Sequence, residues 1–353
     1  MNQEPVSLVL IGAGEIGGRH LKLVVGEPGC RLVAIADPAP QAEAVAREAG
    51  CSYYERYEEM LDGEQPEGAI VAAPTPLHEP IGIACAKRGI HMLMEKPVTD
   101  TVEAGHNLIK AAGDARVQIA VGHHRRFDPA VQAARAIIAS GEIGRLVGVS
   151  GIWATRKHND YYEADWRRQP GGGPVLINLI HDIDMLRFCC GEIESVYAET
   201  RNAERGLQVE DSGAVMLRFR SGAIATITFS DATPSPWGWE RASGDNPRTP
   251  GIPENCFRFF GAEASFEFPN IAIWRNPPPA EPSWLQPIEK ATRPLPQRAA
   301  LAKQLKHFCQ VVRGEVEPRV SAVDGLATLA ATAALLESAR QKQPVQPAFS
   351  LDG

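Results

Sequence analysis

A glycine-rich turn is the first pattern in this sequence that could do chemistry. Gly12, Gly14 and Gly17 have the spacing G-x-G-x-x-G and directly follow the apolar run Val6–Ile11. Gly12 permits a tight turn, Gly14 lets the backbone approach a pyrophosphate, and Gly17 allows the next helix to pack closely on the strand. The free N–H groups at the start of that helix attract phosphates. The pattern therefore predicts a dinucleotide site.

Asp37 indicates which dinucleotide this turn binds. It ends the second apolar run, Leu32–Ala36, twenty residues beyond Gly17. A carboxylate at this place can hold both ribose hydroxyls and repels a 2′-phosphate, so the sequence favours NAD over NADP. Glu15 and Ile16, inside the turn, are expected to contact the same cofactor. The structural alternative is a glycine-rich turn followed by a helix-capping Asp.

Lys96 is the first candidate catalytic residue. It follows the apolar run His91–Met94 within Glu95-Lys96-Pro97. Ligands of an open α/β sheet bind outside the carboxyl ends of its strands, and Lys96 lies at such an end. An ammonium group beside a positively charged nicotinamide has a lowered pKa and could stabilise an alkoxide or donate a proton. The alternative is a surface lysine that precedes a proline.

His181 is the second candidate. We expect a helix over Val175–Cys189 that places Asn178, His181 and Asp182 on one face, with Asp184 three residues beyond the histidine. An imidazole with an ordinary pKa of about 6.5 can take a hydroxyl proton at neutral pH. The alternative is a helix-face histidine hydrogen-bonded to one of the two aspartates. A His-Asp-x-Asp sequence could also hold a metal, but further matched ligands are lacking, so no metal is predicted.

The first third of the chain has the elements of a parallel sheet. Short apolar strands alternate with helices up to about residue 122, a pattern typical of a sheet covered on both faces. The expected strands are Val6–Ile11, Leu32–Ala36, Ala69–Ala73, His91–Met94 and Val117–Val121; the expected helices are Gly17–Val25, Gln41–Ala49, Tyr57–Leu61, Ile81–Arg88 and Val102–Ala112.

Beyond residue 125 the pattern changes to longer strands with alternating polarity, which suits an antiparallel sheet with one solvated face. We expect a helix at Pro129–Ser140, a hairpin turn at Ser221-Gly222, and strands at Leu146–Trp153, Val196–Arg201, Ala214–Arg220, Ala223–Asp231 and Cys256–Phe260. Residues 276–296 are too rich in proline for a helix or a central strand. Helices return at Arg298–Val312 and Val323–Arg340, the second opened by Ser321 and Asp324.

Composition excludes several other classes of protein. With 36 basic and 43 acidic residues the formal net charge is −7, which argues against nucleic-acid or anionic-membrane partners. No uninterrupted apolar run reaches the roughly 18 residues of a membrane helix, and the N-terminus lacks signal-peptide features. The seven cysteines include no CxxC pair, so we expect reduced thiols in a cytoplasmic protein.

The chain resembles the Gfo/Idh/MocA oxidoreductase family, which includes glucose–fructose oxidoreductase and the inositol dehydrogenases. Four stretches carry the resemblance: Glu95-Lys96-Pro97, residues 72–78 (AAPTPLH), residues 125–129 (RRFDP), and Gly171–Gly173 leading to residues 181–184 (HDID). The resemblance implies an N-terminal Rossmann domain, expected at residues 1–123. It also implies a C-terminal α+β domain at residues 124–353 with an open, mostly antiparallel sheet, whose final helices (about 298–340) pack back toward the first domain. Members commonly use the face of that sheet for oligomer contact.

The resemblance also assigns roles to individual residues. It implies that Lys96 is catalytic, with His181, and that the bond before Pro97 is cis. The cofactor contacts it implies, besides the glycine turn and Asp37, are Pro74, Thr75, His78, Glu95 and Lys96. The residues expected to face a sugar-like substrate are Arg125, His158, Trp166, Arg167, Asn178 and Asp184, with Lys157 nearby in sequence. Trp237 and Trp239 could pack on a sugar ring or at an interface.

One position departs from the family pattern. Many dehydrogenases of the family carry an Asp four residues before the histidine, where this chain has Ile177, with Asn178 next to it. An amide can hydrogen-bond a hydroxyl but cannot accept its proton as a carboxylate would. The acid–base work would then fall on His181 and Lys96.

These observations together predict an NAD-dependent oxidoreductase of a sugar, polyol or related small molecule. The expected partners are that substrate and further copies of the chain, as a dimer or tetramer, in the cytoplasm. Two alternatives stay open: a glycosidase that retains NAD and oxidises its substrate transiently, and a non-catalytic NAD-binding regulatory protein.

Overall fold

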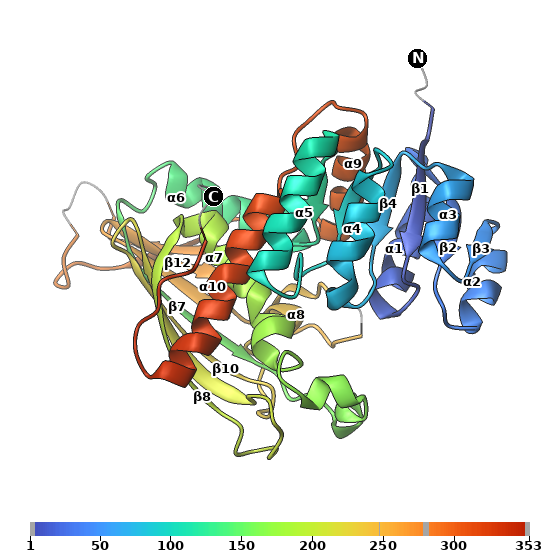
Figure 1. Cartoon of the computed structure of the whole chain (residues 1–353). Coiled ribbons are helices and arrows are strands. Elements are labelled where there is room, and N and C mark those ends of the chain that lie inside the picture. The colour runs from blue at the N-terminus through green and yellow to red at the C-terminus, as the bar shows by residue number, and fades with distance from the viewer. Residues whose placement is uncertain (1–3, 247, 278–281, 350–353) are drawn as a thin grey trace. The chain divides into compact units, whose positions relative to one another are not determined.

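The computed structural model describes residues 4–246, 248–277 and 282–349. The chain forms two compact units: Met1–His124 with Ala300–Leu329, and Arg125–Ala299 with Ala330–Gly353. Figure 1 traces both units along the chain. The first unit thus combines the N-terminal third of the sequence with a later helical segment.

The first unit contains a six-stranded sheet in which every pair of neighbours is parallel, in the order β3-β2-β1-β4-β5-β6. Its strands are β1 (Val6–Ile11), β2 (Cys30–Ala36), β3 (Ser52–Tyr54), β4 (Gly68–Val71), β5 (His91–Met94) and β6 (Ile119–Val121). The order reverses between β1 and β4, so the carboxyl ends of these two strands border the switch point where such sheets bind ligands. The predicted parallel sheet is confirmed; β3 is short and only partly buried, and the sequence pattern missed it.

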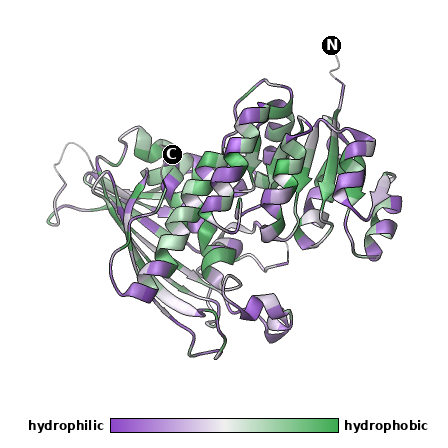
Figure 2. Ribbon diagram, viewed as in Figure 1, coloured by the Kyte–Doolittle hydropathy of each residue, from purple (hydrophilic) through white to green (hydrophobic). Residues whose placement is uncertain are grey.

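Helices cover both faces of this sheet. They are α1 (Glu15–Gly26), α2 (Gln41–Ala49), α3 (Tyr57–Glu64), η1 (Thr75–Leu77), α4 (His78–Ala86), α5 (Val102–Ala115) and α9 (Ala300–Val312). α4 contacts α3 and α5, whereas α1 contacts α9. Figure 2 shows hydrophobic strands between helices whose outer faces are hydrophilic. The strands read as continuous apolar runs because both faces of the sheet are buried.

Helix α9 completes the core of the first unit. Its Leu305 and Phe308 are buried among Leu8 and Leu10 of β1. A Cβ on Gly68 of β4 would lie 2.8 Å from Leu8 and 3.2 Å from the Phe308 ring, so this glycine leaves room for the aromatic side chain on the sheet. A segment almost 300 residues from the N-terminus therefore packs on the first strand.

The second unit is built on an eight-stranded sheet in the order β14-β13-β12-β11-β7-β10-β9-β8. The strands are β7 (Leu146–Ala154), β8 (Ile193–Arg201), β9 (Ser212–Phe219), β10 (Ile224–Ser230), β11 (Phe257–Gly261), β12 (Ala264–Phe268), β13 (Ala272–Arg275) and β14 (Glu289–Thr292). Among the described strands of this sheet only β7 and β10 pair in parallel, so the predicted mostly antiparallel sheet is confirmed. Gly222, with φ of +88°, turns the chain between β9 and β10 as expected.

One face of this sheet is covered and the other is open. The helices of this unit are α6 (Pro129–Ala139), α7 (Ile180–Cys190), α8 (Trp239–Ser243) and the end of α10 (Ala322–Gln341), with short turns η3 (Asn159–Tyr162), η4 (Asp165–Arg168) and η5 (Val175–Leu179); η2 (His124–Phe127) links the units. Side chains of α6, α7 and α10 pack with alternate strand residues in one core. The other strand residues, such as Met216 and Ile224, remain exposed.

Two features of the second unit differ from the expectations, and a third agrees with them. The single helix predicted over Val175–Cys189 is a π-helical turn (η5) followed by α7. Strands β12 and β13 were not predicted. The Pro-rich stretch 276–296 contains β14, which lies at the sheet edge as its composition allows, while residues 278–281 of that stretch fall outside the described residues.

Helix α10 is long and apolar enough to cross a membrane by composition alone. However, 67% of its most apolar window is buried within the structure. This burial is typical of a core helix.

Candidate active site

The glycine turn joins β1 to α1 at the switch point of the parallel sheet. Gly12 has φ of +93°, and a Cβ there would lie 2.6 Å from the Ala72 carbonyl oxygen, at the end of β4. A Cβ on Gly17 would lie 2.0 Å from the Gly12 carbonyl oxygen. Both glycines are therefore required by the fold itself. A Cβ on Gly14, in contrast, would have no described heavy atom within 4 Å.

Asp37 lies beside this turn at the carboxyl end of β2. Its carboxylate accepts hydrogen bonds from the Ala13 N–H at 2.7 Å and the Ala39 N–H at 2.8 Å. The Tyr53 hydroxyl donates to the Asp37 carbonyl, which fixes the backbone of the same residue. Each carboxylate oxygen keeps a further lone pair that a ribose hydroxyl can use. The alternative of a helix-capping Asp is wrong, because α2 begins at Gln41 with Pro40 as its cap.

A dinucleotide fits these residues. α1 starts without a side-chain cap, and a Cβ on Gly14, at this helix start, would meet no described heavy atom within 4 Å. A pyrophosphate can approach such a helix start where no Cβ intervenes. Glu15 is exposed and Ile16 half-buried next to this space, while Pro74 and Thr75 follow β4 on the other side of the switch point.

Lys96 is half-buried on the loop after β5, directly preceding a cis peptide bond to Pro97, as the resemblance implied. His78, on α4, contacts this loop through its imidazole ring. Its Nδ1 lies 2.9 Å from the Pro97 carbonyl oxygen and its Nε2 lies 2.9 Å from the Ala73 carbonyl oxygen. Burial lowers the pKa of His78, and the two carbonyls oppose that shift. The expected cofactor contact of His78 is therefore corrected: the side chain is buried and joins two loops.

Glu95 is also buried rather than turned to a cofactor. Its Oε1 lies 2.7 Å from Nε2 of His20, on α1, and its Oε2 accepts the Lys96 N–H at 3.2 Å. Burial raises the pKa of Glu95, but the hydrogen bond and charge of His20, with Lys96 and His124, outweigh it and bring the pKa to about 2. Glu95 is thus a buried carboxylate that is hydrogen-bonded to the backbone of the Lys96 loop.

In the second unit, the expected substrate residues Trp166 and Arg167 lie on η4. The Trp166 side chain is 53% exposed. The Arg167 guanidinium lies 3.9 Å from the Tyr161 ring centre and 5.1 Å from that of Trp166. A Cβ on Gly172 would lie 2.3 Å from the Trp166 carbonyl oxygen, so the glycine loop packs directly on this turn. His158, at the start of η3, is exposed.

Asn178 and His181 lie where η5 passes into α7, and both are half-buried. The Ile180 N–H donates to the Val175 carbonyl, an i→i−5 bond that widens the helix at this point. Such π turns are frequent at functional sites. The Asn178 Oδ1 is buried, and no described residue donates a hydrogen bond to it. An acceptor without a donor is what a substrate hydroxyl would satisfy.

Arg125 and Asp184 were expected to bind substrate, and the structure corrects both expectations. Arg126 donates two hydrogen bonds, of 2.9 and 2.7 Å, to the carboxylate of Asp184, and both side chains are buried. Buried Arg125 donates to Asp182 at 2.8 Å and to Glu240 at 3.1 Å. These ion pairs link η2 to α7 and α8 and are structural.

The same ion pairs involve both aspartates that follow His181. Asp182 and Asp184 are both buried, and each is paired with an arginine, Arg125 and Arg126 respectively. Burial raises the pKa of Asp182 to about 7, although Arg125 opposes the rise. Trp239 packs in the core against Phe268, with ring centres 5.7 Å apart, whereas Trp237 is exposed.

Sequence reasoning missed a buried polar cluster around Asp231, at the end of β10. Tyr162 donates to its carboxylate, Arg205 donates to it at 3.1 Å, and the Lys157 Nζ lies 3.5 Å away. Burial lowers the pKa of Lys157 to about 8, while Asp231 opposes the shift. Glu210, which is half-buried, accepts the Val175 N–H at the start of η5. In the sequence, Lys157 could be noticed because it lies next to the expected substrate residue His158. No motif or spacing in the sequence pointed to Glu210 or Asp231.

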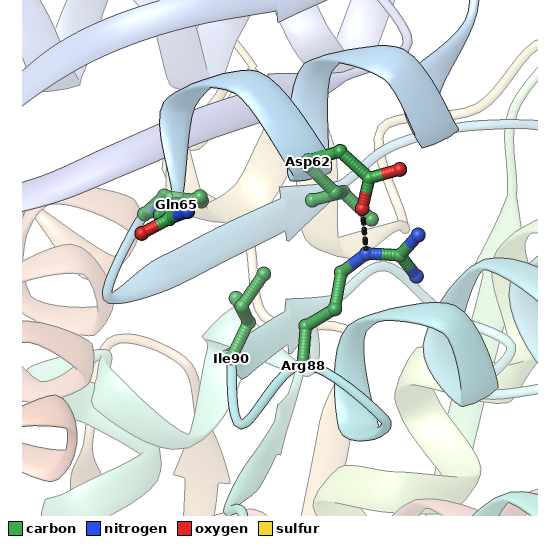
Figure 3. Close-up of a pocket in the computed structure, with 6 residues that line it drawn as sticks. Asp62, Gln65, Arg88 and Ile90 are labelled. Carbon is green, nitrogen blue, oxygen red and sulfur yellow. Dashed lines mark hydrogen bonds and ion pairs between the residues drawn. The ribbon is translucent and has the colours of Figure 1, made fainter.

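A surface hollow of about 280 Å³ in the first unit lies away from these residues. Figure 3 shows Asp62 and Arg88 paired across it, with Gln65 and Ile90 nearby. These residues flank the amino ends of β4 and β5, opposite the end where open α/β sheets bind ligands. Within the described residues, no group of three or more His, Cys, Asp or Glu side chains is arranged to hold a metal.

The fold and the glycine turn define the class: a Rossmann-type dinucleotide-binding protein with a second α+β unit. Residues 6–123 match the family model described as "Oxidoreductase family, NAD-binding Rossmann fold". Residues 131–267 match the model of the GFO/IDH/MocA C-terminal domain. The chain therefore belongs to the Gfo/Idh/MocA family of oxidoreductases.

Similar proteins agree with this assignment. The chain is 28% identical over 354 residues to scyllo-inositol 2-dehydrogenase (NAD(+)) of Bacillus subtilis, covering 98% of this chain and 97% of that protein. It is 30% identical to inositol 2-dehydrogenase of Rubrobacter xylanophilus over 233 residues, which is 64% of this chain and 65% of that protein. The structure of levoglucosan dehydrogenase with NADH and levoglucosan superposes with a TM-score of 0.78 at 22% identity, covering 98% of this chain and all of that one, and supports the fold.

Proposed function

We propose that the protein is an NAD-dependent oxidoreductase that interconverts a CH–OH group and a carbonyl group on a sugar, polyol or related polyhydroxylated small molecule. The glycine turn carries the proposal: it is open at Gly14 beside the uncapped start of α1, and Lys96 follows β5, which lies two strands from β1 in the same sheet. Similarity to an NAD-dependent inositol dehydrogenase over nearly the whole chain supports the substrate class.

We assign the proton and charge chemistry to two residues. In the oxidative direction, His181 accepts the hydroxyl proton, and the Lys96 ammonium stabilises the developing alkoxide. NAD, when bound, supplies the hydride acceptor at its nicotinamide ring. Fixing the reacting carbon in position contributes much of the rate acceleration.

Substrate recognition is assigned to polar and aromatic side chains of the second unit. Asn178 offers a carbonyl oxygen without a donor among the described residues, and Arg167 offers the donors of its guanidinium. Trp166 and His158 present exposed rings on the same stretch of chain. With Ile177 in place of the family's Asp, Asn178 would orient a hydroxyl while His181 takes its proton.

Asp37 supports a preference for NAD over NADP, because its carboxylate would repel the 2′-phosphate of NADP.

We also propose that the chain acts in the cytoplasm as a homo-oligomer, a dimer or tetramer. The open face of the second sheet supports this, because Met216, Ile224 and Phe260 are exposed on it. Light scattering coupled to size-exclusion chromatography tests the oligomer, and a monomer at micromolar concentration contradicts it.

A substrate screen tests the proposed activity. NADH absorbance is followed over a panel of monosaccharides, anhydrosugars, inositols and sugar acids, in oxidation and in reduction of the keto forms. We expect turnover with at least one compound of the panel. Product release from a glycoside without net NADH would indicate an NAD-retaining glycosidase instead. Tight NAD binding with no turnover in either direction would indicate a regulatory protein.

A further inference from the structure

A buried histidine–carboxylate contact connects the helix that starts at the glycine turn to the loop that carries Lys96. His20 lies on α1, three residues beyond Gly17, and its Nε2 is 2.7 Å from Oε1 of Glu95. Both side chains are almost fully buried. Burying this polar pair costs desolvation that a hydrophobic pair of similar volume would avoid.

The surroundings of Glu95 are shaped around its carboxylate. A Cβ on Gly122 would lie 2.8 Å from Oε2 of Glu95, so the glycine after β6 leaves the space that the carboxylate fills. The same Oε2 accepts the Lys96 N–H at 3.2 Å. The charged or titratable groups that act on Glu95 are His20 from α1, Lys96 from its own loop, His124 from η2 and, at the start of α4, His78.

A second buried histidine holds the other side of the loop. His78 contacts the carbonyl of Pro97 and the carbonyl of Ala73, each at 2.9 Å. Lys96 therefore lies between two anchored residues, Glu95 and Pro97. Each anchor comes from a helix that follows a strand bordering the switch point, α1 after β1 and α4 after β4.

We propose that Glu95 and His20 are positioning residues for Lys96: the buried carboxylate, held by His20, fixes the Lys96 loop and favours the ammonium form of its side chain. The inference rests on the proposed function, in which that ammonium stabilises an alkoxide. Lys96 must be held rigidly, because small displacements of a catalytic group cost large factors in rate. Glu95 and His20 would provide that rigidity.

The first test measures Lys96 directly and needs no substrate. The amine of Lys96 is labelled with acetic anhydride across pH 7 to 11 in the full-length protein, and the extent is read by mass spectrometry. In Glu95→Gln the labelling midpoint should move to lower pH, because the neighbouring negative charge that favours the ammonium is gone. At pH 8 the labelling rate should rise by about threefold to tenfold. Lys22, exposed on α1, is the internal reference.

Glu67→Gln is the matched control. Glu67 also accepts a backbone N–H, from Ser7 at 2.7 Å, but at the amino end of the same sheet. This variant should leave both Lys96 labelling and turnover unchanged. An equal change of Lys96 labelling in Glu95→Gln and Glu67→Gln, or none in either, overturns the proposal.

The second test measures the consequence for turnover. In Glu95→Gln, kcat should fall by about tenfold to a hundredfold, while the Kd for NADH stays within about threefold of wild type. His20→Gln keeps a hydrogen-bond donor for Glu95 and should fall between wild type and Glu95→Gln. Melting temperatures identify variants that fail to fold. If Glu95→Gln is less stable than wild type but keeps its kcat and its Lys96 labelling, the proposal is overturned. A labelling shift in a protein that turns over no substrate supports the positioning role and rejects the proposed function alone.

Discussion

Replacing Gly14 by Ala should separate cofactor binding from folding. Gly14 has φ of −64° and ψ of −161°, a conformation open to any L-residue. No described heavy atom lies within 4 Å of a Cβ built there. The only cost to the free protein is a poorer helix cap, about 1 kcal/mol or less, so the melting temperature should fall by no more than about 4 °C.

The bound state should respond differently. If the pyrophosphate lies against the Gly14 backbone, the added methyl group occupies its place. Overpacking of this kind costs about 1–3 kcal/mol, which raises the Kd for NADH by about 5- to 150-fold. NADH fluorescence titration gives the Kd, and circular dichroism gives the melting temperature of the same samples.

Two neighbouring glycines provide the controls. Gly18→Ala lies inside α1 with no described atom within 4 Å of its Cβ, so it should leave the Kd unchanged and stabilise the helix by up to about 1 kcal/mol. Gly17→Ala places a Cβ 2.0 Å from the Gly12 carbonyl oxygen and should lower both stability and binding. Wild-type NADH affinity in Gly14→Ala, or a loss of stability as large as in Gly17→Ala, would refute the reasoning.

Three further predictions concern buried polar groups. Arg126→Met leaves the buried Asp184 carboxylate without its bidentate partner and should lower the free energy of unfolding by about 3–5 kcal/mol in urea titrations; a loss below 1 kcal/mol would contradict the structural role. Because the folded-state pKa of Glu95 is lowered from 4.5 to about 2, its contribution, about 3 kcal/mol, should be present above pH 4.5 and lost as the pH falls toward 2. Unfolding of wild type and Glu95→Gln across that range measures it, and parallel pH curves would be the contrary result. Asn178→Leu removes a buried acceptor that no described residue satisfies, so it should keep or raise the melting temperature while turnover falls; unchanged turnover would exclude a substrate contact.

The sequence predicted the fold well where one local pattern decides the structure. The strands of the parallel sheet are continuous apolar runs bounded by helices, and the glycine turn carries its own steric reason, visible in the close approach of Gly12 to Ala72. Short strands such as β3 and β13 lack a run long enough to show. A π turn has the same composition as an α-helix, so η5 could not be told from α7.

The candidate site was predicted less completely, because side-chain partners far apart in sequence decide which groups face a ligand. Asp184 is taken by Arg126, 58 residues away, and Glu95 by His20, 75 residues away. The residue types that bind a sugar also build buried ion pairs, and only the fold distinguishes them. Lys96, His181 and Asn178 remain half-buried, consistent with the roles proposed for them.

The most direct test of the central claim compares wild type with Lys96→Met on the substrate that the screen identifies. The rate of NADH formation and the Kd for NADH are measured on the same preparations. The proposed function predicts that Lys96→Met binds NADH within about threefold of wild type and loses at least about a hundredfold in kcat, the lower end of the range for removal of a general acid–base group or charge stabiliser. Full turnover in Lys96→Met with intact NADH binding would contradict it.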